Sequence, residues 1–237
     1  YCGIFSVYTA GKVYLKHQNM LVTTICNLNC EYCLNYNPYN KCQSHFSLEE
    51  LKRSADTYFS HIDRVGFFEL TGGEPMLYPD LQELLTYILD NYESKINELA
   101  FVTNGSVIPS DEICEFLKTH KVMVLVDDYS EAVPQISSNL FKTTDKLRRF
   151  GANVIVVSKM REFIKQFPPS REYAGISTEK TQEKFRKCFN GMQNLRDGQL
   201  CSCTYMAFAV NAKLMPNNAD DWFDMNKMSD NELDKKS

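Results

Sequence analysis

The chain has 237 residues, 43% of them hydrophobic, which is enough for one large buried core with at most a small appendage. Its 30 acidic and 26 basic residues give a net charge of −4, and no basic cluster with interleaved aromatic residues occurs, so nucleic-acid binding is disfavoured. No apolar run of about 18 residues and no secretion signal is evident, so we expect neither a membrane span nor export. Nine cysteines in such a chain fit thiolates kept for metal in a reducing cytoplasm better than a disulfide framework.

The first predicted strand, residues 20–25, leads into a loop with three closely spaced cysteines. Cys26, Cys30 and Cys33 form a C-x3-C-x2-C pattern, and Tyr32 precedes the last of them. Thiolates at this spacing select zinc, copper(I) or an iron–sulfur cluster. Three ligands favour a cluster with one open iron, because structural zinc takes four ligands. The alternative is a zinc-binding or solvent-exposed cysteine loop.

A helix is expected next, because Ser47 and Glu50 form a capping-box pattern, and it should run to about Ile62. The second strand, residues 66–71, ends in the segment Gly72, Gly73, Glu74 and Pro75. Two glycines let the backbone approach a ligand closely, and the glutamate adds a hydrogen-bond acceptor. A simple strand-to-loop turn is the alternative interpretation.

Alternating helices and strands continue along the chain. We expect helices at 79–92, 110–119 and 139–150, and strands at 99–103, 122–126 and 154–157, with the apolar fourth strand covered on both faces. Five strand–helix repeats in about 140 residues predict a parallel sheet, short of an eight-stranded barrel. The weak stretch Tyr173–Ile176 is the best candidate for a sixth strand.

The cysteine loop and the glycine segment together resemble the signature of the radical S-adenosylmethionine (radical SAM) superfamily. The resemblance implies an α/β fold, a partial (β/α)6 TIM-like barrel open on one side, with a small C-terminal hairpin and helix extension. It implies a [4Fe–4S] cluster on Cys26, Cys30 and Cys33, whose fourth iron chelates the methionine moiety of S-adenosylmethionine. It also implies that the segment Gly72, Gly73, Glu74 and Pro75 binds the amino group of that moiety. The expected division is an N-terminal segment at 1–18, a barrel core at 19–167 and a C-terminal extension with a polar tail at 168–237.

Polar residues at the strand ends should surround the cofactor, because active sites of such barrels lie at that edge. The expected cofactor contacts are Tyr32, Asn104, Asp127 and Ser158, and the candidates for a catalytic role are Asp127, Asp128 and Tyr129. Asp127 or Asp128 would accept ribose hydroxyl groups, and Lys159 or Arg161 would pair with the carboxylate. A solvated loop residue is the alternative for each.

A second cysteine group lies near the C-terminus. Cys188, Gly198 and Cys203 form C-x9-G-x4-C, which resembles the opening of the auxiliary-cluster extensions called SPASM and twitch domains. Asp197-Gly198 suits a tight turn between short strands. No cysteine follows Cys203, unlike in those extensions, and Cys201 is the local third candidate. Either a second iron–sulfur cluster on Cys188, Cys201 and Cys203 or a hairpin without metal is therefore expected.

Three flanking elements complete the prediction. Residues 179–187 and Thr204–Val210 should be helical, and Trp222 and Phe223 should be the only large apolar anchors of the tail. We expect Cys2, Cys42 and Cys114 to be ordinary thiols, often buried.

The implied activity is reductive cleavage of S-adenosylmethionine to a 5′-deoxyadenosyl radical, which abstracts a hydrogen atom from a small polar substrate. The strand end at 126–130 and the hairpin at 195–203 are similar to those of small radical SAM proteins of bacterial sugar and natural-product pathways, which favours an oxidoreductase acting on a sugar or cyclitol. The electron would come from an external donor of the flavodoxin or ferredoxin type. The alternatives are a peptide or protein maturase and a non-enzymatic metal-binding protein.

Overall fold

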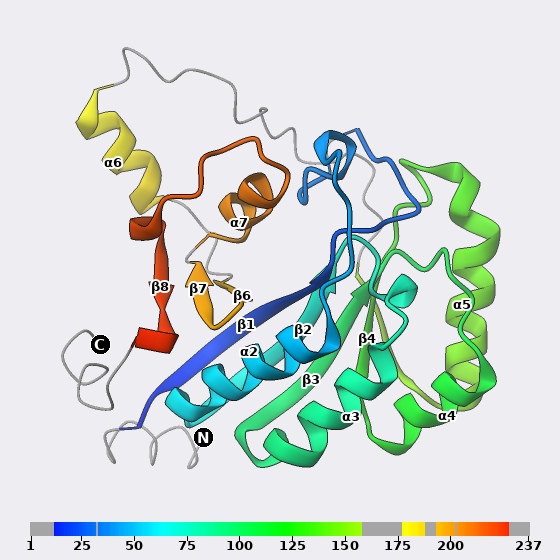
Figure 1. Ribbon diagram of the computed structural model, residues 1–237. Coiled ribbons are helices and arrows are strands. Elements are labelled where there is room, and N and C mark those ends of the chain that lie inside the picture. The colour runs from blue at the N-terminus through cyan, green and yellow to red at the C-terminus, as the bar shows by residue number, and fades with distance from the viewer. Residues whose placement is uncertain (1–11, 32, 158–176, 188–192, 202, 228–237) are drawn as a thin grey trace.

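The structure is a computed structural model that describes residues 12–31, 33–157, 177–187, 193–201 and 203–227 (Figure 1). Several predicted features lie outside these residues: Cys2, Tyr32, Ser158, Lys159, Arg161, Tyr173–Ile176 and Cys188.

A single eight-stranded sheet organises the described chain, in the order β5-β4-β3-β2-β1-β6-β7-β8. The first six strands are mutually parallel, and β7 and β8 are antiparallel additions. The strands are β1 (Tyr14–Thr23), β2 (Arg64–Gly72), β3 (Ile96–Thr103), β4 (Met123–Asp127), β5 (Asn153–Val157), β6 (Gln193–Arg196), β7 (Gln199–Cys201) and β8 (Trp222–Asp224). The α/β fold with a partial, unclosed barrel is thereby confirmed.

Four helices lie along one face of the sheet in Figure 1: α2 (Leu48–His61), α3 (Leu81–Tyr92), α4 (Asp111–Thr119) and α5 (Ser137–Phe150). Their apolar sides pack on β1 to β4 in one core, in which Tyr58 and Phe59 of α2 contact Phe68 of β2. Each fully buried large side chain contributes about 1.5–3 kcal/mol. This helical layer covers one face, and the opposite face of the sheet is left for the site.

Local start signals are confirmed in the helices. Ser47 caps α2 in a complete capping box with Glu50, and Ser110 caps α4 by accepting a hydrogen bond from the Ile113 amide. The remaining described helices are α6 (Thr178–Arg186) and α7 (Thr204–Asn211). No helix in the described ranges is both long and apolar enough to cross a membrane.

The prediction that the fourth strand is covered on both faces is wrong. In β4, Val124 and Val126 are buried under the helices, whereas Met123, Leu125 and Asp127 are only partly buried. Leu125 and Asp127 line a cavity instead. An apolar sequence does not distinguish these cases, because a cavity wall can be as apolar as a packed interface.

Strand β1 starts six residues earlier than predicted, at Tyr14 rather than residue 20. Its first half reads as polar because His17 and Asn19 line the cavity. Gln18, on the alternate face, is buried and donates hydrogen bonds to the Asn19 and Gln193 carbonyl groups. The polar residues of β1 therefore line the cavity on one face and contact β6 on the other. A hydrophobicity pattern cannot reveal either role.

The predicted turn at Asp197-Gly198 is confirmed. Both residues have positive φ, 48° and 68°, as a type I′ two-residue β-hairpin turn requires, and they join β6 to β7. Strand β6 lies parallel to β1, with Gln193 opposite Gln18 and Leu195 opposite Met20. The hairpin thus extends the sheet beyond β1 and brings α7 over the open face (Figure 1).

The tail is anchored differently from the prediction. Trp222 is buried in β8, but Phe223 is 37% exposed, whereas Met225 is only 1% exposed and packs into the main core. Side chains alternate along a strand, so neighbouring residues cannot both point inward.

Candidate active site

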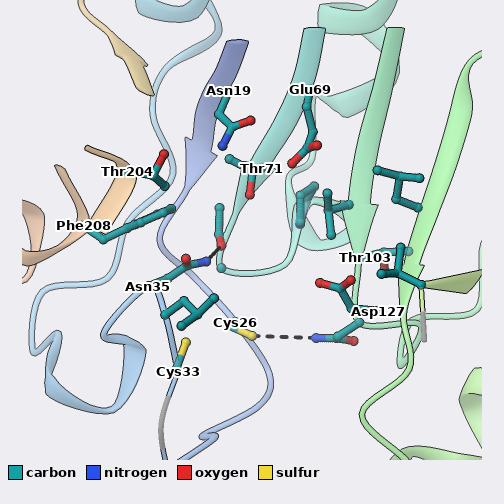
Figure 2. A pocket seen from close by; sticks show the side chains of 18 of the residues that line it. Asn19, Cys26, Cys33, Asn35, Glu69, Thr71, Thr103, Asp127, Thr204 and Phe208 are labelled. Atoms are coloured by element: carbon teal, nitrogen blue, oxygen red, sulfur yellow. Dashed lines mark hydrogen bonds between the residues drawn. The ribbon is translucent and has the colours of Figure 1, made fainter. Parts of the chain in front are cut away.

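A cavity of about 550 Å³ opens at the carboxyl ends of the parallel strands (Figure 2). Its walls come from β1 to β5, the cysteine loop and α7. Barrel-type sheets place functional side chains at this edge. Most of the cavity lining is apolar, so its few polar groups stand out.

All three cysteines of the loop, Cys26, Cys30 and Cys33, are free and line this cavity. The Leu28 amide donates to the Cys26 Sγ at 3.4 Å, and Asn104 Nδ2 donates to the same sulfur at 3.8 Å. Burial raises the pKa of both Cys26 and Cys30 to about 11, with a further contribution from Glu74 and Cys33 at Cys26 and from Cys33 and Cys26 at Cys30. Burial likewise raises the pKa of Cys33. Without a cationic centre, these side chains are therefore neutral thiols.

Three thiols are the kind of donor set that an iron–sulfur cluster takes. Within the described ranges, no three His, Cys, Asp or Glu side chains gather closely enough to hold one metal ion. In a cluster each thiolate binds its own iron, so the ligands surround a body instead of meeting at a point. Three free thiols on one cavity meet this requirement.

Gly72 and Gly73 also line the cavity, but they meet backbone on their other side. A Cβ on Gly72 would lie 2.2 Å from the Thr23 carbonyl oxygen, and one on Gly73 would lie 2.2 Å from that of Ile25. The Gly73 amide donates to Thr23 O and the Glu74 amide to Ile25 O, both at 2.8 Å. The sequence predicts that the two glycines let the backbone approach a ligand. The structure shows that they let β2 approach the end of β1, the strand that leads into the cysteine loop.

Glu74 lies beneath the cavity rather than in its wall. Its carboxylate is fully buried and accepts hydrogen bonds from Met76 N (2.9 Å), Thr103 Oγ1 (2.7 Å) and Asn104 N (2.8 Å). Pro75, the next residue, does line the cavity. Glu74 therefore fixes the backbone at the end of β3. In doing so it positions Asn104, whose side-chain Nδ2 reaches the Cys26 sulfur.

This arrangement predicts a pH-dependent stability. Burial raises the pKa of Glu74 from 4.5 to about 7, so between these values the folded state binds more protons than the unfolded state. The free energy of unfolding should therefore fall as pH rises through this window, by on the order of 3 kcal/mol from this group, and then level off. Denaturant unfolding of wild type and Glu74→Gln near pH 5 and about pH 8 checks this. The variant should lose part of the pH dependence; identical pH dependence in both proteins would contradict it.

The end of β4 sends its side chains in two directions. Asp127 and Tyr129 line the cavity, and the Tyr129 hydroxyl donates to Asp127 Oδ2 at 2.9 Å. Burial raises the pKa of Asp127 to about 6. Asp128 is buried outside the cavity lining and accepts a hydrogen bond from the Ser130 amide. Of the three catalytic candidates, the structure brings two to the cavity.

Cys201 and Cys203 are not among the residues that line this cavity. Cys201 is buried in an apolar cluster with Ala207, Val210 and Trp222, and its Sγ donates to the Cys203 carbonyl at 3.2 Å. Cys203, partly exposed, is the N-cap residue of α7.

Sequence reasoning missed the polar residues that β1 and β2 contribute to the cavity and its α7 wall. The missed residues are His17 and Asn19 of β1, Glu69 of β2, and Thr204, Tyr205 and Phe208 of α7. One signal was available for Glu69, which interrupts an apolar strand and shares its face with Phe67 and Thr71. A charge inside such a strand indicates a site.

Comparison with known proteins places these features in a family. The profile described as Radical SAM superfamily matches residues 20–159. Uncharacterized protein MJ0907 of Methanocaldococcus jannaschii is 28% identical over 168 residues, which are 65% of this chain and 57% of that protein. The antilisterial bacteriocin subtilosin biosynthesis protein AlbA of Bacillus subtilis is 32% identical over 111 residues, 46% of this chain and 23% of that protein.

A solved structure shares the fold. Histidine-tagged anSMEcpe with bound AdoMet superposes with a TM-score of 0.50 at 18% identity, over 60% of this chain and 42% of that chain. The chain spans 57% and 23% of the lengths of the two curated relatives.

Proposed function

The chain belongs to the radical SAM superfamily, and from this we propose that Cys26, Cys30 and Cys33 hold a [4Fe–4S] cluster beside bound S-adenosylmethionine. The observation that carries the proposal is the set of three free thiols on one cavity, next to Gly72 and Gly73. Once reduced by an external low-potential donor of the flavodoxin or ferredoxin type, this pair supplies a 5′-deoxyadenosyl radical that removes a hydrogen atom from the substrate.

The residues of the chain bind and orient the cofactor. We assign the methionine moiety to the Gly72–Pro75 backbone, and the ribose hydroxyl groups to Asp127, which Tyr129 holds in place by its hydrogen bond. Asn104 orients Cys26, and Glu74 positions Asn104. Tyr32 and Ser158 are proposed as further contacts, as the resemblance implies. The apolar walls exclude water, which would otherwise compete for the reactive species.

We propose an oxidation or rearrangement of a small polar molecule of the sugar or cyclitol type. The cavity must hold both cofactor and substrate in about 550 Å³, which suits a small molecule, and its end away from Cys26 and Cys33 carries the polar side chains of Asn19 and Glu69 (Figure 2). The test is anaerobic incubation of the reconstituted, reduced protein with S-adenosylmethionine and deuterated polyols. Formation of deuterated 5′-deoxyadenosine supports the proposal. Failure to form 5′-deoxyadenosine under reduction contradicts the cofactor assignment, and its formation without deuterium contradicts the substrate class.

Maturation of a peptide is the second candidate. The similarity of 46% of this chain to AlbA, a bacteriocin biosynthesis protein, supports a peptide substrate. A mass shift on a co-expressed precursor peptide would establish this function and displace the first.

We propose the division into a segment at 1–18, a barrel core at 19–167 and a twitch-like extension at 168–237. Cys188, Cys201 and Cys203 are the candidate ligands of a second cluster in that extension. The apolar surroundings and the local hydrogen bond of Cys201 favour a hairpin without metal.

Iron counting distinguishes these alternatives. The reconstituted protein is expected to hold about four iron atoms per chain, the content of one cubane cluster. Cys203→Ala should leave that number unchanged, because only Cys26, Cys30 and Cys33 act as ligands. Iron and sulfide analysis of both proteins measures it. About eight iron atoms in wild type, falling in the variant, would establish the second cluster.

A further inference from the structure

We infer that Asn19 and Glu69, side by side on the inner face of β1 and β2, form a binding site for an amine group of the substrate. This inference rests on the proposed function, because it names the chemical group that the same cavity binds at its end away from Cys26 and Cys33. An amine is protonated near neutral pH and presents several N–H donors around one positive charge.

The sheet register brings the two side chains together. Asn19 lies opposite Glu69 in the parallel pairing of β1 and β2, so both point to the cavity side of the sheet. Asn19 is only 3% exposed and Glu69 only 7%. Figure 2 shows both side chains directed into the cavity, at the end away from Cys26 and Cys33.

Asn19 offers an acceptor that the described residues leave unused, and the Glu69 carboxyl group lies within ion-pair distance of His17. The Asn19 Oδ1 is buried and has no hydrogen-bond partner among the described residues. Glu69 Oε2 lies 3.4 Å from His17 Nε2, and that nitrogen makes no hydrogen bond to any described group. A buried acceptor that receives no hydrogen bond costs free energy. A ligand that donates an N–H group to it removes this cost and therefore binds more tightly.

The charge of the cavity selects the ligand's sign. Glu69 and Asp127 both face it, whereas no lysine or arginine of the described ranges lines it, and His17 is the one basic side chain that does. His17 is held edge-on against the Phe67 ring, with 5.1 Å between ring centroids. An anion would meet two carboxyl groups, and an alcohol would bring no positive charge to Glu69, whose ion-pair partner within the described ranges is His17. A cationic amine satisfies both the charge and the donor requirement.

The position of this amine site within the cavity affects which part of the substrate can react. Because the amine site and the thiols lie at opposite ends of the cavity in Figure 2, a substrate anchored at Asn19 and Glu69 directs its remaining carbon atoms toward the thiol end. The anchor thereby selects which C–H bond of the substrate meets the reactive centre.

Binding of matched amine and alcohol probes tests the inference. We would titrate the reconstituted protein, with S-adenosylmethionine bound, by calorimetry with glucosamine and glucose and with n-butylamine and 1-butanol. The amine of at least one pair is expected to bind about 10- to 100-fold more tightly, the range for a charge-assisted hydrogen bond. Glu69→Gln should abolish that preference. Glu98→Gln, the same change at an exposed position of β3, should keep it.

A second variant covers the case in which Glu69→Gln fails to fold. Asn19→Asp places a carboxylate at the unpartnered oxygen and should strengthen the amine preference. Equal binding of amine and alcohol in wild type, a preference that survives in Glu69→Gln, or one that Asn19→Asp leaves unchanged or weakens would overturn the inference. Formation of 5′-deoxyadenosine by wild type without probe is measured separately. Its failure would reject the proposed function, while the amine preference is judged on the titrations alone.

Discussion

Replacing Cys26, Cys30 or Cys33 by alanine is expected to remove the bound iron and abolish reductive cleavage of S-adenosylmethionine. Each thiol is only partly buried and forms no disulfide, so the fold should tolerate its loss. The remaining two cannot hold a cluster that already lacks a fourth protein ligand. The loss of 5′-deoxyadenosine formation should exceed the roughly 10- to 100-fold typical of outer-shell changes at metal sites. Visible absorption near 400 nm, iron content and product formation measure it.

Cys42 supplies the matched control. It lies in the same polar loop but is exposed and outside the cavity lining, so Cys42→Ala should keep iron and activity. Retention of wild-type iron in any of the three loop variants would show that the corresponding thiol is not a ligand.

Gly73→Ala is expected to disrupt the site through the backbone. The new Cβ would lie 2.2 Å from the Ile25 carbonyl oxygen and 2.9 Å from that of Thr24, and neither is the end of a flexible side chain. Relief of these contacts requires breaking the bonds from Gly73 N to Thr23 O and from Glu74 N to Ile25 O. We expect a stability loss of about 3 kcal/mol or more together with loss of iron, because Cys26 follows directly on this backbone.

Gly151→Ala separates crowding from the general cost of replacing a glycine. Gly151 ends α5 at a φ of 82°, where a Cβ would meet no atom closer than 3.9 Å. Its replacement costs about 1–2 kcal/mol for the left-handed conformation alone and should leave the iron content intact. Denaturant unfolding and iron analysis of both variants decide the matter. Equal stability and equal iron in the two would refute the coupling between β2 and the cysteine loop.

Features encoded by a few neighbouring residues could be predicted from the sequence. The caps at Ser47 and Ser110 and the turn at Asp197-Gly198 depend on local hydrogen bonds and backbone preferences, and all three are confirmed. The cysteine loop belongs to the same class, because ligand spacing is a local property. Its presence on the cavity could therefore be anticipated.

Features that depend on distant partners could not be predicted. Glu74 reads as a ligand-binding carboxylate, yet its partners Thr103 and Asn104 lie 29 and 30 residues away and hold it beneath the cavity. Helix α7 lines the cavity only because β6 pairs with β1, and no pattern within the β6 sequence specifies this pairing. The polar start of β1 resembles a loop until the cavity that it lines is known. In each case tertiary context overrides the local signal.

The pairing of β1 with β6 also sets an order of assembly. The hydrogen bond between Gln18 and Gln193 joins residues 175 positions apart, so β1 to β5 and the cysteine loop leave the ribosome well before β6 and α7. Contacts of such long range form late, because the chain must first lose the entropy of closing a large loop. Until then the seam edge of β1 lacks its parallel neighbour and the cysteines face solvent without the α7 wall. The cavity that the cysteines line therefore gains its α7 wall only in the last stage of folding.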